Sequence, residues 1–156
     1  MDPQLLPLML ALPLLVAVAM SDLRSLRIPK YLVVLCGLLF LATASVLGSG
    51  ELLARLLAAG IALVVCFALF AARIIGGGDA KFFPVFILFV PSGEVALFML
   101  SLSVGIVASA IAVSAARIHG SEERAPQWTA LRKSSGFPMG VAFLAAALVF
   151  LSLAQA

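Results

Sequence analysis

Apolar residues occur along the chain in five long runs, and short polar segments separate them. The long runs cover residues 3–20, 31–47, 52–72, 95–116 and 137–153. A helix needs about 20 apolar residues to cross roughly 30 Å of hydrocarbon. Continuous runs of this length are typical of membrane-spanning helices rather than of helices with one apolar face. The pattern therefore predicts an all-α membrane protein.

A sixth apolar run, Phe82 to Val90, is shorter. As a helix it rises only about 14 Å, too little to cross a bilayer alone. Continuing through Pro91-Ser92-Gly93-Glu94 to Ala116 would give one helix of about 52 Å, which is too long. The Pro-Ser-Gly-Glu segment is typical of a turn. The chain thus has either five spans, or six with a short fourth helix.

The distribution of basic residues favours six spans. With six, the polar segments 21–30, 73–81 and 117–133 share one side and hold three, two and four of the ten Lys and Arg residues, leaving only Arg55 opposite. With five, the last segment changes sides and the basic residues divide equally. Because basic residues concentrate in cytoplasmic loops, we expect six helices with both termini outside the cytoplasm.

Composition agrees with this topology. The chain of 156 residues is 64% hydrophobic and 11% charged, with a mean hydropathy of +1.24. Soluble domains are about 45–50% apolar and about 25% charged, and disorder requires low hydrophobicity. Both classes are therefore excluded. The segment 117–133 is too short for a second domain, so we expect residues 1–156 to form a single integral-membrane domain.

Two of the seven acidic residues stand apart. We interpret the other five as solvated charges in tails, turns or the long polar segment: Asp2, Glu51, Glu94, Glu122 and Glu123. Asp22 directly follows the first apolar run, and Asp79 closes Gly76-Gly77-Gly78-Asp79 before the short run. The six-span topology puts both at cytoplasmic ends of helices. Ionisable groups at membrane depth indicate a functional site, although Asp22 also fits an interfacial stop and Asp79 a helix N-cap.

The three glycines before Asp79 bear on its role. Consecutive glycines are costly in a helix and unnecessary for a cap. They allow close backbone approach, or an extended edge with which a peptide pairs. A phosphate-binding loop is disfavoured, because Gly-Gly-Gly-Asp-Ala-Lys lacks the P-loop spacing and the carboxylate repels phosphate.

Two adjacent carboxylates share a proton and can hold a water molecule between them. One takes a proton from that water while the other protonates the scissile carbonyl oxygen, which hydrolyses a peptide bond without a metal. The single His, and Cys36 and Cys66 within apolar runs, offer neither a catalytic triad nor a metal site. We therefore expect an aspartic endopeptidase with no cofactor.

The sequence around these aspartates resembles the type IV prepilin peptidase family of Gly-x-Gly-Asp intramembrane aspartic proteases. Asp22-Leu23-Arg24-Ser25-Leu26-Arg27-Ile28-Pro29-Lys30 is similar to the family's first motif, with Lys30 in place of Asn. Gly76 to Lys81 meets the Gly-x-Gly-Asp-x-Lys motif. Pro138-Met139-Gly140 is similar to Pro-Tyr-Gly before the last helix, with Met139 in place of an aromatic residue.

The resemblance implies catalytic residues and a substrate. Asp22 and Asp79 would be catalytic, with Gly76, Gly77, Gly78, Lys81, Arg27 and Pro29 supporting them or contacting substrate. The substrate would be the leader of a prepilin or pseudopilin, cut on the cytoplasmic face of the bacterial inner membrane. Arg24, Arg27, Lys30 and Lys81 are either interfacial anchors or contacts for an acidic residue beyond the cut, and Pro29 also simply suits the start of a helix.

The chain lacks the Cys-x-x-Cys extension of the members that also N-methylate. It resembles the short peptidase-only members of tight-adherence (Flp) pilus systems, and the related archaeal preflagellin peptidases share the motifs. Expected partners are the leader peptide and the lipid bilayer, with no nucleic acid.

Two other function classes fit parts of the sequence. A small transporter subunit would use Asp22 and Asp79 as proton or cation sites, but such sites usually lie near mid-bilayer within repeat symmetry, which the sequence lacks. A non-catalytic assembly subunit would use small residues for helix packing, and Ala108, Ser109 and Ala112 suit that role.

Overall fold

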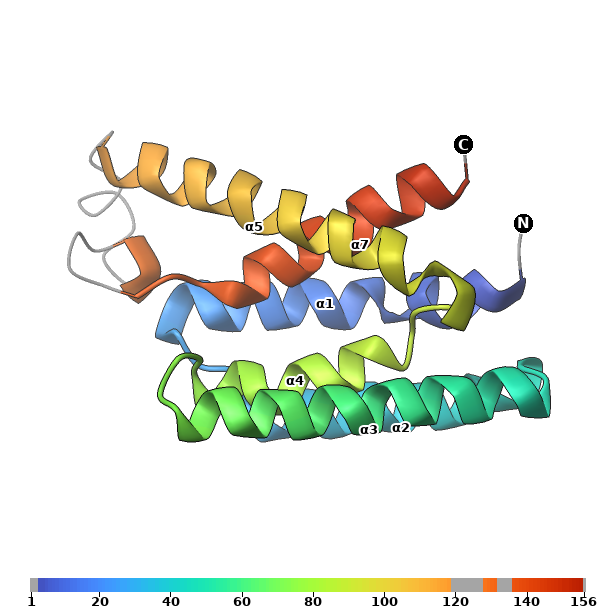
Figure 1. Cartoon of the computed structure of the whole chain (residues 1–156). Helices are drawn as coiled ribbons and strands as arrows, with labels where there is room; N and C mark the ends of the chain where they lie inside the picture. The colour runs from blue at the N-terminus through green and yellow to red at the C-terminus, as the bar shows by residue number, and fades with distance from the viewer. Residues whose placement is uncertain (1–2, 119–127, 132–135, 156) are drawn as a thin grey trace. The chain divides into compact units, whose positions relative to one another are not determined.

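The computed structural model describes residues 3–118, 128–131 and 136–155. All regular structure within these ranges is helical, so the all-α prediction is confirmed (Figure 1). The α-helices are α1 (Leu6–Ser25), α2 (Lys30–Thr43), α3 (Ser49–Ala71), α4 (Gly77–Ile87), α5 (Val95–Ile118) and α7 (Met139–Ala154). Short 3₁₀ helices are η1 (Pro3–Leu5), η2 (Ala44–Val46), η3 (Ser92–Glu94) and η4 (Thr129–Leu131).

Each of the six predicted apolar runs forms a helix. The predicted break at Pro91 to Glu94 is also present, since α4 ends at Ile87 and η3 leads into α5. The structure differs from the predicted run at the start of α4, because the helix begins at Gly77 rather than at Phe82. The first turn of this short helix therefore contains Asp79.

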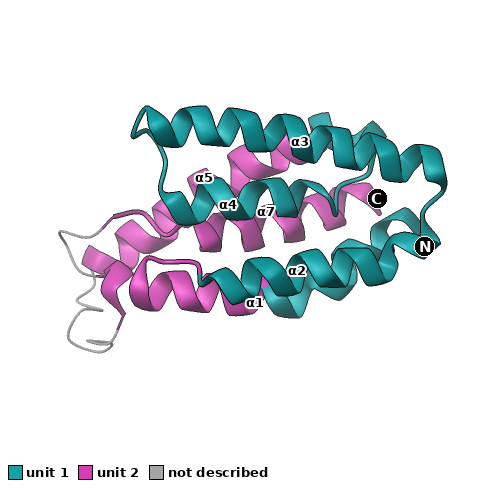
Figure 2. Ribbon diagram, turned by 90° about the horizontal axis from the view of Figure 1, so that it is seen from below, with its two compact units in different colours: residues 1–14, 29–96 teal, residues 15–28, 97–156 magenta. Residues whose placement is uncertain are grey.

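The described helices divide into two compact units (Figure 2). Unit 1 comprises residues 1–14 and 29–96, and unit 2 comprises residues 15–28 and 97–156. Helix α1 contributes to both. The division follows Pro13, which lies inside α1 and has no N–H to donate to the preceding turn.

In unit 1 the short helix α4 packs against α3 and α2. Aromatic rings fill this contact. Phe40 of α2 meets Phe89 edge to face with ring centroids 5.7 Å apart, and Phe82 and Phe86 of α4 stack at 5.8 Å. Because lipid is as apolar as these rings, their stabilisation comes from close packing rather than from escape from water.

In unit 2 helices α5 and α7 approach closely at Gly105. A Cβ at this position would lie 2.8 Å from both the Ala142 carbonyl oxygen and the Ala146 nitrogen. Such small-residue contacts are typical of membrane helices. Ser109 is buried on the same face of α5, as its predicted packing role requires, whereas Ala108 and Ala112 are exposed.

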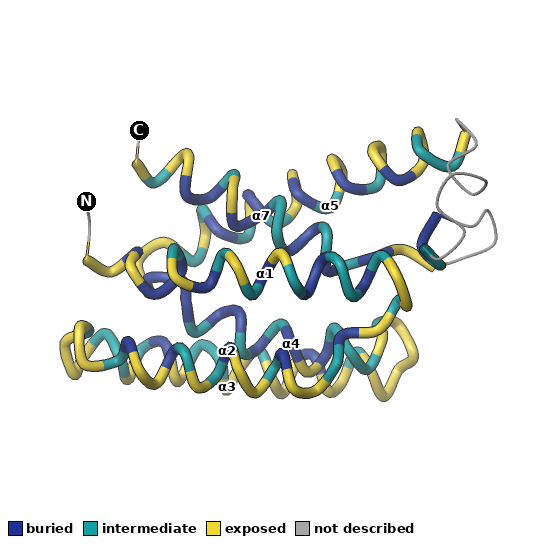
Figure 3. The backbone as a smooth tube through the Cα atoms, turned by 180° about the vertical axis from the view of Figure 1, so that it is seen from behind, coloured by how far each residue is buried: buried dark blue, intermediate teal, exposed yellow. Residues whose placement is uncertain are grey.

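The surface of the helices is strongly apolar. Figure 3 shows α3 exposed along most of its length. Large exposed apolar side chains of α3 include Leu57, Ile61, Val64 and Phe67. Three helical stretches are long and apolar enough to cross a membrane by length and composition: Pro3–Ser25, Ser49–Ala71 and Ser92–Ile118. A continuous apolar surface of this kind is stable against lipid and not against water, so the chain is a membrane protein.

Candidate active site

Asp22 lies in the last turns of α1, within unit 2, and only 4% of its surface is exposed. Its Oδ2 accepts a hydrogen bond of 2.6 Å from the main-chain N–H of Gly140. Gly140 is in the first turn of α7, where N–H groups have no partner within the helix. The helix N-cap, Pro138, makes no side-chain capping bond. A carboxylate from α1 thus caps α7.

Position 140 accommodates only glycine in this geometry. A Cβ there would lie 2.8 Å from the Asp22 Cβ and 3.1 Å from the Val18 carbonyl oxygen. A side chain would force α7 away from α1 and stretch the bond to Asp22. The Pro138-Met139-Gly140 segment therefore contacts Asp22 through its backbone.

The chain leaves α1 one turn after Asp22. Leu26 ends α1 in the left-handed region with φ of 50°, and its N–H donates to the Asp22 carbonyl oxygen at 2.8 Å. The hydroxyls of Ser21 and Ser25 donate to the Arg27 carbonyl oxygen at 3.2 and 3.4 Å. These bonds hold the backbone of Arg27 against the turn that carries Asp22, while the Arg27 side chain is exposed.

Asp79 lies in unit 1, in the first turn of α4, and is half-buried. The N-cap of α4 is Gly76, so the interpretation of Asp79 as an N-cap is wrong. The carboxylate folds back toward this residue, since a Cβ at Gly76 would lie 3.1 Å from Asp79 Oδ2. The partial positive charge of the helix N-terminus stabilises an ionised carboxylate at this place.

The glycines before Asp79 have different conformations. Gly76 is extended, with φ of −71° and ψ of 149°, whereas Gly77 and Gly78 are already helical. An extended peptide-binding edge over all three glycines is therefore wrong. Close approach does occur at Gly77, where a Cβ would lie 3.1 Å from the Phe70 ring of α3. Lys81, one turn further, is exposed.

Backbone strain adjoins both motifs. Among the described residues, the non-glycine positions with positive φ are Leu26 at 50° and Arg73 at 60°. Each such residue costs about 1–2 kcal/mol. Leu26 ends the helix that carries Asp22, and Arg73 follows α3 just before the glycines. Each therefore sets the direction in which the chain leaves a helix beside a candidate aspartate.

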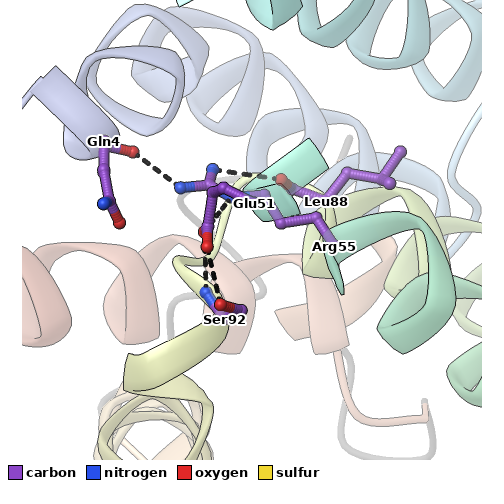
Figure 4. A network of polar contacts seen from close by, with 5 residues as sticks. All are labelled: Gln4, Glu51, Arg55, Leu88 and Ser92. Atoms are coloured by element: carbon purple, nitrogen blue, oxygen red, sulfur yellow. Dashed lines mark hydrogen bonds and ion pairs between the residues drawn. The ribbon is translucent and has the colours of Figure 1, made fainter. Parts of the chain in front are cut away.

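A buried ion pair in unit 1 was not predicted (Figure 4). Arg55 is fully buried, and its Nε lies 2.7 Å from Glu51 Oε1. Its other nitrogens donate to the carbonyl oxygens of Leu88 and Gln4 at 3.3 and 3.1 Å. Ser92 donates to Glu51 through its main-chain N–H at 2.8 Å and its hydroxyl at 2.6 Å.

The interpretation of Glu51 as a solvated charge is thus wrong, because Glu51 is paired with the buried Arg55. The usable signal was their i,i+4 spacing on one helix face. The spacing alone does not distinguish a buried pair from an ordinary polar helix end, because both residues lie near the start of an apolar run.

A comparison with known families accounts for both aspartate motifs together. The sequence pattern of the type IV leader peptidase family matches residues 9–114, which include Asp22 and Asp79. The chain belongs to this family. No curated protein and no solved structure matches the chain. Membership in the type IV leader peptidase family implies a peptidase that acts on prepilin-type leader peptides.

The predicted site residues of this leader peptidase fall in both units. Unit 2 brings Asp22 together with the backbone of Arg27 and with Gly140. In unit 1, Gly76 is the N-cap of α4, and Gly77, Gly78, Asp79 and Lys81 lie in the first five residues of that helix. Pro29, also in unit 1, is the N-cap of α2, with Lys30 the first helical residue, one position from its predicted place. The part of the chain that the structure describes contains no cluster of three or more His, Cys, Asp or Glu side chains suited to a metal ion.

Proposed function

We propose that this leader peptidase is an aspartic endopeptidase in which Asp22 and Asp79 act as one catalytic pair. The family match that spans both motifs carries this proposal. The surroundings of Asp22 support it, because a buried carboxylate held by one neutral N–H is a strong candidate for chemistry. The proposed enzyme uses no metal or other cofactor.

The proposed reaction is hydrolysis by a shared-proton mechanism. With Oδ2 of Asp22 engaged by Gly140, its Oδ1 remains for a water molecule. One aspartate takes a proton from this water while the other donates a proton to the scissile carbonyl oxygen. When the tetrahedral intermediate collapses and its C–N bond breaks, the aspartate that took the water proton passes it to the departing amine, and the other aspartate regains its proton from a hydroxyl of the intermediate. Gly76, Gly77 and Gly78 support Asp79 by allowing α4 to begin tightly against α3.

The proposed substrate is the leader of a type IV prepilin-like precursor, either an Flp pilin or a pseudopilin. The cut is made at the cytoplasmic face of the bacterial inner membrane. Arg27 and Lys81 carry exposed side chains beside the two motifs, which suits contacts with an acidic residue after the cut. Pro29 orients the start of α2 and supports the Arg27 backbone.

The proposed topology has six membrane helices, with α4 the short fourth and both termini outside. Helix α4 is long enough to span only part of a bilayer. Its contacts with α2 and α3 fit a short helix that is held by its neighbours. Single cysteines at Ser25 and Ser49 test the topology, because reagent added from outside should label only Ser49→Cys. Labelling of Ser25→Cys from outside would contradict the proposed sidedness of the membrane helices. A further test position, Ser121, lies outside the described residues.

The pair itself is tested with Asp22→Asn, Asp79→Asn and the double variant. Asparagine preserves size and most hydrogen bonding but cannot share a proton. Each single change should reduce cleavage of a prepilin leader by about 10³- to 10⁴-fold, and the double variant should be no worse, because both groups serve one transition state.

The matched control is Glu94→Gln, an exposed carboxylate outside both motifs, which should cleave at the wild-type rate. Cleavage is measured with candidate prepilins in membranes that contain equal amounts of each variant. An inserted Asp22→Asn or Asp79→Asn chain that trims a leader at near wild-type rate would refute the catalytic pair.

A further inference from the structure

The segment that binds Asp22 is in turn hydrogen-bonded to the end of α5. The Gly140 N–H that binds Asp22 belongs to the short stretch 136–140. Four residues before it, the Gly136 carbonyl oxygen accepts a hydrogen bond of 2.8 Å from Nη2 of Arg117, at the end of α5. All of these residues belong to unit 2.

Arg117 also binds a second carbonyl group. Its Nε and Nη2 both donate to the Ala130 carbonyl oxygen, at 3.0 and 2.7 Å. The planar guanidinium thus joins η4 to the segment that leads into α7. Lysine presents a single point of charge and cannot reproduce this geometry.

The stretch 136–140 lies between Arg117 and the turn after Asp22. On one side Arg117 binds the Gly136 carbonyl, and on the other a Cβ at Gly136 would lie 3.9 Å from the Leu26 side chain. Pro138 stiffens the link between Gly136 and Gly140, because its φ is restricted. A shift at Gly136 is therefore transmitted to the Gly140 N–H.

We propose that Arg117 and Gly140 are positioning residues for the Asp22 carboxylate. The inference rests on the proposed function, and it concerns residues beyond the matched range 9–114. Arg117 fixes the entry of α7, and Gly140 lets α7 approach closely enough for its N–H to orient Asp22 Oδ2. Neither residue touches the substrate. The charge of Arg117 as a cytoplasmic anchor is a separate role that lysine would also fill.

The first experiment separates positioning from anchoring. Arg117→Lys keeps the charge and removes the two-carbonyl contact, and Arg73→Lys is the matched control at an exposed arginine. Because a displacement of about 1 Å at a catalytic group can cost about 10²-fold, we expect kcat of Arg117→Lys to fall about 10- to 100-fold with KM unchanged. Wild-type kcat in Arg117→Lys, or a raised KM with unchanged kcat, would overturn the proposal.

The second experiment tests the close approach at Gly140. Gly140→Ala should lower kcat at least as much as Arg117→Lys, again without a change in KM. Gly37→Ala is its control, since a Cβ at Gly37 meets nothing within 4 Å. Equal activity of Gly140→Ala and Gly37→Ala in equally inserted protein would contradict the positioning role.

A third measurement does not depend on cleavage. Cysteines replace Leu26 and Gly136 in a chain whose Cys36 and Cys66 are alanine, and a short thiol cross-linker is added. Cross-linking should be efficient with Arg117 and at least several-fold weaker in Arg117→Ala. Dependence on Arg117 would support the anchored segment even if the chain cleaved no leader, a result that refutes only the proposed function. Equal cross-linking with and without Arg117 would refute the anchor itself.

Discussion

Each compact unit buries an ionisable side chain, and the two side chains differ in how many partners they have. In unit 1 the Arg55 guanidinium has a carboxylate at 2.7 Å and two carbonyl oxygens as partners. In unit 2 the Asp22 carboxylate has one main-chain N–H at 2.6 Å. No described residue forms an ion pair with Asp22.

This difference separates a charge with several partners from one that fits the catalytic role proposed for Asp22. A buried ion with several partners, one of them of opposite charge, is fixed in place and contributes to a specific geometry. A buried carboxylate with one neutral donor keeps an oxygen for other partners, such as a water molecule or a second carboxyl group. Burial alone therefore does not support a catalytic role, whereas burial with a single neutral donor fits the role proposed for Asp22.

The largest expected effect on stability is at Arg55. Arg55→Met removes one partner of a buried ion pair and leaves Glu51 without its counter-ion, which costs about 3–5 kcal/mol. We expect a corresponding drop in the free energy of unfolding in detergent, measured by denaturant titration. A loss below about 1 kcal/mol would show that the pair is not a structural element.

The double-mutant cycle with Glu51→Gln sharpens this result. Replacing both partners removes the uncompensated charge, so Arg55→Met with Glu51→Gln should recover about 1–3 kcal/mol relative to Arg55→Met alone. The same unfolding assay gives the coupling energy. Strictly additive losses would mean that the two side chains act independently.

Asp22→Asn should behave in the opposite way, with its effect on activity rather than on stability. The asparagine oxygen still accepts the Gly140 N–H, and the cost of burying a charge disappears. We therefore expect the free energy of unfolding to stay within about 1 kcal/mol of wild type or to rise. A loss as large as that of Arg55→Met would make Asp22 a structural residue like Arg55.

A smaller effect is expected at Ser92. Ser92→Ala removes the hydroxyl that donates to Glu51 at 2.6 Å but keeps the main-chain bond, so about 1 kcal/mol of stability should be lost. Ser103→Ala is the control, because its exposed hydroxyl bonds only within its own helix. Equal unfolding free energies of the two variants would exclude Ser92 from the network.

No effect is expected from metal removal. The proposed chemistry needs two carboxylates and water alone, so treatment with a chelator should leave the rate of leader cleavage unchanged. The cleavage assay with and without chelator measures this directly. Activity lost to the chelator and restored by zinc would contradict the aspartic mechanism.

The sequence by itself determined the helices and the candidate aspartates. Apolar runs long enough to span a bilayer must form helices, because backbone groups in lipid can bond only within the segment. This constraint acts locally, so the six α-helices of the described residues were predicted, including the short α4, as was the turn at Pro91 to Glu94. The motifs around Asp22 and Asp79 are likewise contiguous in sequence, and so they were recognisable without a structure.

Only the tertiary structure decided which polar groups meet. The start of α4 at Gly77 depends on the close approach of Gly77 to Phe70, which no local propensity shows. Glu51 is paired with Arg55 and Ser92, and Asp22 bonds a residue 118 positions away in Gly140. These contacts join helices that the apolar pattern treats as equivalent. In a chain whose helices are apolar on nearly every face, hydrophobicity does not specify neighbours, and packing of small residues and a few buried polar groups does.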